Sequence, residues 1–196
     1  RDGGHGHRRP RRDADRGIEI RGKRAKKSQA MKLTSFEAIM DALNRKGVRY
    51  LLVGGMAVVA HGYGRMTADI DLVVQLKRDN ILKALEALAA LGFHPRAPVK
   101  AEQFADEETR KRWIREKGMV VFALFSEAHK ETPVDVFVSE PFDFDATYNK
   151  AVEADVNGVK FLSVDRQTLI DMKLAAGRPL DLQDVRQLRM LAGDEK

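Results

Sequence analysis

The chain has 196 residues, of which 43% are apolar and 33% are charged, and it contains no cysteine. This composition suits one globular domain, and it excludes disulfides, zinc sites built from thiolates and cysteine nucleophiles. No apolar run approaches the length of a membrane span and no signal-peptide h-region opens the sequence, so we expect a cytoplasmic protein without a membrane partner.

The formal net charge of +6 is concentrated in the first thirty residues. Residues 1–30 contain eleven basic and four acidic side chains, which leaves residues 31–196 with a net charge of −1. The segment is rich in Gly and Arg and has no apolar periodicity, so we predict a disordered basic tail over 1–30 and a folded domain over 31–196. Because the first methionine is Met31, the tail is either an upstream or artificial extension or an RNA-binding arm.

From Met31 onward, segments with the helical period alternate with short apolar segments bounded by Gly, Pro or Asn. In chain order they predict a helix at 34–47, a strand at 50–53, a helical turn at 56–61, a strand at 70–75, helices at 79–92 and 107–117, strands at 119–125 and 134–138, and helices at 165–176 and 180–191. Asn157-Gly158 indicates a two-residue hairpin turn. The pattern predicts an α/β (α+β) fold with a small mixed β-sheet flanked by helices. The sheet would span about residues 48–163, followed by a helical C-terminal part at about 164–193.

Two acidic residues flank Ile70 at the start of the second predicted strand. Asp69 and Asp71 are two positions apart, and side chains at that spacing on a strand point to the same face. Their Cα atoms would lie roughly 7 Å apart. Both carboxylates can therefore converge on hard cations, which sit about 3.5–4 Å from each other in two-metal sites. An isolated pair of this kind is also typical of the solvent-exposed face of an edge strand.

The glycine pair Gly54-Gly55 precedes this strand. Glycine lets the backbone approach a ligand closely, so the pair fits the phosphates of a bound nucleotide at a helix start, or else forms an ordinary tight turn. Arg65 is placed to meet a phosphate or is a solvent-exposed loop charge. A degenerate Rossmann-type nucleotide binder, with Asp69 or Asp71 on the ribose, is an alternative interpretation. The sequence contains neither a P-loop nor a G-x-S-x-G motif.

Gly54-Gly55 followed by Asp69-Ile70-Asp71 resembles the signature of the nucleotidyltransferase superfamily, which includes DNA polymerase β, kanamycin nucleotidyltransferase and the abortive-infection toxin nucleotidyltransferases. The resemblance implies a third carboxylate on a later strand, and Asp135 within Pro133-Val134-Asp135-Val136-Phe137 is similar to that element. Lys173-x4-Arg178 and Asp181-x2-Asp184 resemble the C-terminal motifs of the toxin group, although no Arg directly precedes Asp181. This implies that Lys173 and Arg178 bind the nucleotide, with Asp184 as an additional site residue.

The resemblance implies a transferase that moves a nucleoside monophosphate from an NTP donor to an acceptor hydroxyl. Asp69, Asp71 and Asp135 would be both catalytic residues and the ligands of two Mg²⁺ ions, with Mn²⁺ as a substitute. The acceptor would be tRNA, a protein or a small molecule, and membership of the toxin group would bring an antitoxin partner. A different class of function is a catalytically idle RNA-binding module that uses the basic tail.

Overall fold

The computed structural model describes residues 33–193, so the predicted tail at 1–30 lies outside the described residues. The helices are α1 (Leu33–Arg45), α2 (Gly54–Ala60), α3 (Arg78–Ala90), the short 3-10 helix η1 (Ala101–Ala105), α4 (Glu107–Lys117), α5 (Phe144–Tyr148), α6 (Arg166–Ala176) and α7 (Pro179–Ala192). The strands are β1 (Tyr50–Val53), β2 (Ile70–Val74), β3 (His94–Pro95), β4 (Val121–Phe125), β5 (Val134–Phe137), β6 (Val152–Val156) and β7 (Val159–Ser163).

The strands form one mixed sheet in the order β3-β4-β5-β2-β1-β7-β6. β1 pairs antiparallel with β2, while β2 pairs parallel with β5 and β1 pairs parallel with β7. The predicted mixed sheet flanked by helices is confirmed. The Rossmann-type alternative is wrong, because that unit requires parallel strands on either side of its glycine turn and β1 and β2 run antiparallel.

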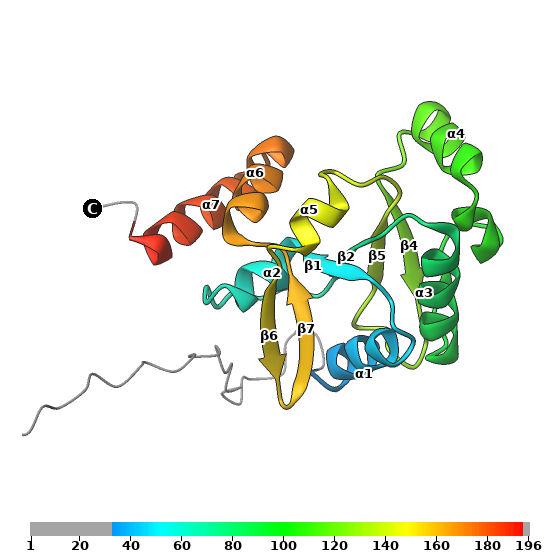
Figure 1. Cartoon of the computed structure of the whole chain (residues 1–196), viewed down its shortest axis with the longest axis horizontal. Helices are drawn as coiled ribbons and strands as arrows, with labels where there is room; N and C mark the ends of the chain where they lie inside the picture. The colour runs from blue at the N-terminus through cyan, green and yellow to red at the C-terminus, as the bar shows by residue number, and fades with distance from the viewer. Residues whose placement is uncertain (1–32, 194–196) are drawn as a thin grey trace, which may run out of the picture.

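Helices cover both faces of this sheet (Figure 1). All four residues of β1 are buried, as expected for a central strand with a helix layer on each side. Leu52 packs in the core that includes α1 and α3, whereas Leu51 and Val53 pack in the core that includes α2, α6 and α7. In β2, Leu72 belongs to the first core. Since successive side chains on a strand alternate in direction, Asp71 faces the layer of α2 and α6.

The C-terminal helices α6 and α7 pack against each other beside α2, at the left of Figure 1. The Asp165 side chain caps the start of α6 by accepting a hydrogen bond from the Thr168 amide at 3.1 Å. Gly177 ends that helix with a φ of 64°, and Pro179 is the first residue of α7. These stop and start signals turn the chain back within three residues, which places the two helices side by side.

Most predicted elements are present within one to three residues of their expected ends. The hairpin turn is confirmed, because Asn157 and Gly158 both have positive φ, 52° and 86°, between β6 and β7. No sequence pattern predicts β3, η1 or α5, which are two to five residues long and too short to show a period. Within residues 33–193, no helix is both long and apolar enough to cross a bilayer.

Candidate active site

Two of the predicted metal ligands lie directly opposite each other in the sheet. β2 and β5 are parallel neighbours, and their register pairs Asp71 with Asp135. Directly opposed side chains project from the same face of a sheet, so both carboxylates lie on the α2 and α6 side. Asp69 stands just before β2, two residues from Asp71. The sheet therefore brings Asp135 beside Asp69 and Asp71, at one end of the neighbouring strands β2 and β5.

Two of the three carboxylates, Asp71 and Asp135, have raised pKa values. The pKa of Asp71 is raised to about 6, first by burial and then by repulsion from Asp135 and Asp69. Burial and the Asp69 charge also raise the pKa of Asp135. The Gly55 amide donates a hydrogen bond to Asp71 and opposes the increase in its pKa. The site thus concentrates negative charge that the surrounding cations only partly balance, which is the environment that a bound cation stabilises.

The glycine pair fits closely against Asp71 and the loop after α2. Gly54 has a φ of 66°, and a Cβ atom on it would lie 1.9 Å from Oδ2 of Asp71. A Cβ atom on Gly55 would lie 2.4 Å from Oγ1 of Thr67 and 2.6 Å from Nη2 of Arg65. Both positions thus require the absence of a side chain. The start of α2 can then approach the carboxylates and the Arg65 guanidinium at the same time.

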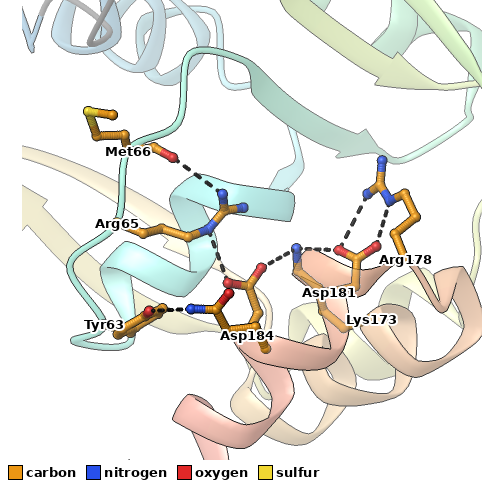
Figure 2. A network of polar contacts seen from close by, with 8 residues as sticks. Tyr63, Arg65, Met66, Lys173, Arg178, Asp181 and Asp184 are labelled. Atoms are coloured by element: carbon orange, nitrogen blue, oxygen red, sulfur yellow. Dashed lines mark hydrogen bonds and ion pairs between the residues drawn. The ribbon is translucent and has the colours of Figure 1, made fainter. Parts of the chain in front are cut away.

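A network of ion pairs joins α6, α7 and the loop after α2 (Figure 2). Lys173 Nζ lies 2.8 Å from Oδ1 of Asp181 and 2.8 Å from Oδ2 of Asp184. Arg65 Nε lies 3.2 Å from Oδ1 of Asp184. Arg178, at the start of α7, donates a hydrogen bond from Nε to Oδ2 of Asp181 at 2.5 Å. The network has three cationic side chains and two carboxylates, so its excess charge is positive.

Burial differs sharply across this network. The side chains of Lys173, Asp181 and Asp184 are 5%, 2% and 0% exposed, whereas that of Arg178 is 75% exposed. Neither oxygen of Asp184 has a hydrogen-bond partner among the described residues, so its contacts with Lys173 and Arg65 are ion pairs alone. Lys173 and Arg65 are therefore held in place by carboxylates, while Arg178 retains access to solvent.

A cleft of about 970 Å³ separates the acidic strands from the C-terminal helices. One wall contains Gly54, Asp71 and Asp135, and the facing wall contains Lys173, Arg178 and Asp181. The remainder is largely apolar, with a lining that includes Val121, Phe137, Phe142, Met172 and Ala176. The structure thus brings five of the predicted site residues to one cleft. Among the described residues, Asp69, Gly55, Arg65 and Asp184 do not line it, and the last three support its walls from behind.

Residues 31–192 match the family described as nucleotidyltransferase of unknown function (DUF6036). The chain belongs to this family. It is therefore a transferase, and the resemblance to the nucleotidyltransferase superfamily is confirmed. No curated protein matches its sequence.

Solved structures share the fold of this nucleotidyltransferase. The lincosamide antibiotic adenylyltransferase LnuA, bound to lincomycin, has a TM-score of 0.56 and 14% identity, over 83% of this chain and 99% of that one. ANT(2″)-Ia, in complex with adenylyl-2″-tobramycin, has a TM-score of 0.54 and 15% identity, over 81% and 87% of the two chains. TM1012 from Thermotoga maritima has a TM-score of 0.51 and 12% identity, over 83% and 93%. At these identities the similarity establishes the fold alone.

The donor set of the cleft suits a hard divalent cation. Among residues 33–193, no group of three or more His, Cys, Asp or Glu side chains is already arranged to hold a metal ion. Asp69, Asp71 and Asp135 nevertheless lie near enough for their charges to raise the pKa of Asp71 together. They offer only carboxylate oxygens, the ligands that Mg²⁺ prefers. Both this chemistry and the mutual repulsion of the three carboxylates fit Mg²⁺.

One charged residue near these carboxylates, Arg96, is not marked by any sequence motif. The Arg96 guanidinium opposes the increase in the pKa of Asp135, so the two charges lie close enough to interact. Arg96 follows the two-residue strand β3 and is exposed. No periodicity marks so short a strand, so the position of Arg96 is evident only from the pairing of β3 with β4.

Proposed function

We propose that this protein transfers a nucleoside monophosphate from an NTP to an acceptor hydroxyl in a reaction that requires Mg²⁺. The observation that carries the proposal is the register of Asp71 with Asp135, beneath Gly54 and across the cleft from Lys173 and Arg178. Phosphoryl-group transfer depends on positioning and on neutralising negative charge, and this cleft combines a place for cations with cationic side chains.

Asp69, Asp71 and Asp135 are the residues that would hold the metal, as two Mg²⁺ ions or as Mn²⁺. Bound there, the metal would neutralise charge on the α-phosphate, the attacking oxygen and the leaving pyrophosphate. The glycine pair lets the start of α2 lie close to these carboxylates and to Arg65, because a side chain at either position would overlap Asp71, Thr67 or Arg65. Metal binding also relieves the repulsion among the three acids, so the site and the ion stabilise each other.

The cations of the facing wall would act in two ways. Arg178 is exposed and can rotate toward a triphosphate, where its guanidinium makes charge-assisted hydrogen bonds. Lys173 is buried between two carboxylates, so we assign it a fixed positive charge at the wall of the cleft. Arg65 has its Nη2 beside Gly55 and is fixed by Asp184, which suits a phosphate contact at the glycine pair.

The acceptor is the least determined part of the reaction. LnuA is bound to lincomycin and ANT(2″)-Ia to an adenylylated tobramycin, so this fold can modify small molecules. For the present chain, tRNA and protein acceptors, a toxin role and an antitoxin partner stay predictions from motif resemblance. NTP donors are abundant in the cytoplasm, where we place the reaction.

Incubation of the full chain with each α-labelled NTP, Mg²⁺ and cell extract tests the proposal. We expect label to appear in one acceptor fraction, to need Mg²⁺ or Mn²⁺, and to vanish in Asp71→Asn and Asp135→Asn. Glu153→Gln, exposed on the edge strand β6, serves as the matched control and should retain activity. Absence of label with every NTP, combined with salt-sensitive RNA binding that is lost on deletion of residues 1–30, would instead support the idle RNA-binding module.

A further inference from the structure

The catalytic face of the sheet continues beyond Asp135 onto β4. On β4, Phe122 and Leu124 are buried in the core with α1 and α3, whereas Val121, Ala123 and Phe125 point the other way and are partly exposed. The register pairs Ala123 with Asp135, so Ala123 and Asp135 share a face. The surface next to Asp135 is therefore open on the side of β4, opposite to the side of β1 and α2.

Arg96 lies beside Ala123, one strand further from Asp135, so Asp135, Ala123 and Arg96 form one row across the sheet. The pairing of His94 with Phe125 and of Pro95 with Leu124 places Arg96 opposite Ala123, and the Arg96 amide donates a hydrogen bond to the Ala123 carbonyl at 2.9 Å. Two strand spacings, about 10 Å, separate the backbones of Arg96 and Asp135. Because Ala123 stands between them, only a methyl group occupies the intervening surface.

The Arg96 guanidinium has no ion-pair partner in the part of the chain that the structure describes. An exposed, unpaired guanidinium beside a catalytic carboxylate provides a binding site for an anionic group. The same charge repels polycationic acceptors such as aminoglycosides.

An aromatic surface adjoins this cation. The rings of His94 and Phe125 lie 4.0 Å apart between centroids, with their planes tilted by 55°. Extending the register by one residue aligns Phe125 with Pro133 and Asp69, so the rings lie in the row next to that of Arg96. His94 is exposed and Phe125 is half-buried. Nucleobases stack on such rings.

We propose that this β3–β4 surface, formed by His94, Arg96 and Phe125, binds the acceptor, and that the acceptor is a nucleotide unit: the 3′ end of an RNA or a free nucleotide. This inference rests on the proposed function. Arg96 contacts a phosphate, the rings stack against the base, and the ribose hydroxyl lies beside Asp135. Donor phosphates bind on the opposite side, near Gly54 and Arg178, which suits the in-line arrangement of attacking and leaving oxygens.

In the transfer, the acceptor hydroxyl oxygen bonds to the α-phosphorus of the NTP. The bond from that phosphorus to the oxygen bridging the β-phosphate breaks, pyrophosphate leaves and the hydroxyl proton passes to water. Arg96 contacts the acceptor alone in this arrangement. Its removal should therefore raise the KM for the acceptor without changing the KM for the NTP.

The first test measures transfer from an α-labelled NTP by the full chain to four probes: an RNA trinucleotide with a 3′-hydroxyl, the same trinucleotide with a 3′-phosphate, 5′-AMP and tobramycin. We expect label in the first or the third probe, which distinguishes RNA from a free nucleotide.

Arg96→Ala should raise the KM for that probe about tenfold, because it removes one charge-assisted contact with the acceptor. Arg112→Ala, another exposed arginine on α4, should match wild type. Label in tobramycin alone, or equal KM values for Arg96→Ala and Arg112→Ala, would overturn the proposal.

A second test does not depend on turnover. The fluorescence anisotropy of dye-labelled forms of the trinucleotide and of 5′-AMP is measured with the full chain, without NTP or Mg²⁺, at about 150 mM salt. Such short probes make few phosphate contacts with the basic tail. We expect Arg96→Ala and Phe125→Leu to weaken binding of one probe and Arg112→Ala to leave it unchanged. If no probe is labelled but these differences in binding are observed, the proposed function is refuted and the β3–β4 binding site is supported. Equal binding by all variants, or binding of neither probe, would refute the site.

Discussion

Gly54 and Asp71 are in such close contact that any side chain on Gly54 would overlap the Asp71 carboxylate, since a Cβ atom there would lie only 1.9 Å from Oδ2. The contact joins the start of α2 to the second residue of β2. It links a glycine and an aspartate that are well separated in the sequence. The same closeness provides a direct test.

Gly54→Ala should destabilise the protein more than Gly47→Ala. Both glycines have similar positive φ values, 66° and 62°, so both alanines incur the left-handed backbone cost of about 1–2 kcal/mol. At Gly47 a Cβ atom would meet nothing within 4 Å, whereas at Gly54 it would overlap Asp71. The additional loss at Gly54 therefore measures the steric term. Chemical denaturation measures the free energy of unfolding of the two variants, and equal losses of stability would contradict the close contact.

Asp71→Asn should abolish transfer yet stabilise the metal-free protein above neutral pH. Because the folded-state pKa of Asp71 is raised to about 6, this group makes stability fall as pH rises from about 4 through 6. The shift of about two units corresponds to roughly 3 kcal/mol at most. Asparagine removes the repelled charge, so the stability difference between the variant and wild type should grow over this range. Denaturation without divalent ions at pH 4 and pH 8 tests the sign, and a variant less stable than wild type at pH 8 would contradict it.

Mg²⁺ should raise the melting temperature of wild type and have little effect on Asp71→Asn or Asp135→Asn. A ligand that binds only the folded state stabilises it by mass action, and removal of one carboxylate leaves an incomplete site. Glu153→Gln, on the edge strand β6, is a suitable control because it changes the net charge equally. The same Mg²⁺-induced shift in all four proteins would argue against metal binding by these carboxylates.

The sequence was sufficient to predict the central part of the fold and the proximity of the acidic residues, for identifiable reasons. Leu51, Leu52 and Val53 form an uninterrupted apolar segment because both faces of β1 are covered, and such segments are visible in sequence. Asp69 and Asp71 were recognisable because strand period and spacing are local properties. The pairing of Lys173 with Asp184 depends on how α6 meets α7, which no local pattern encodes. The position of Arg96 likewise depends on the register of a two-residue strand.

Asp184→Ala should cost about 3–5 kcal/mol of folding free energy, the usual result of removing one partner from a buried ion pair. The carboxylate is fully buried between Lys173 and Arg65, so its loss removes the ion-pair partner of Arg65 and leaves Lys173 with Asp181 alone. Asp171→Ala removes an exposed carboxylate from α6 and should change stability by less than about 0.5 kcal/mol. Urea denaturation measures both variants. A small change in Asp184→Ala would show that the network is not important for stability.

The last prediction concerns the donor nucleotide and separates Arg178 from its neighbour Lys173. Lys173→Ala should weaken NTP binding by about 1.5–3 kcal/mol, but it also leaves Asp181 and Asp184 partly unpaired and should destabilise the fold. Arg178→Ala removes an exposed guanidinium and leaves Asp181 paired with Lys173, so it should weaken binding of the Mg²⁺–NTP complex by a similar amount with a smaller loss of stability than Lys173→Ala.

Calorimetric titration of each variant with the preferred NTP and Mg²⁺, alongside thermal unfolding, tests both effects. Arg189→Ala, exposed nearer the other end of α7, is the matched control and should bind like wild type. If Arg178→Ala and Lys173→Ala both retain the wild-type dissociation constant, the C-terminal helices do not contact the donor. Arg65, with its Nη2 beside Gly55, would then be the remaining cation placed to bind the phosphates.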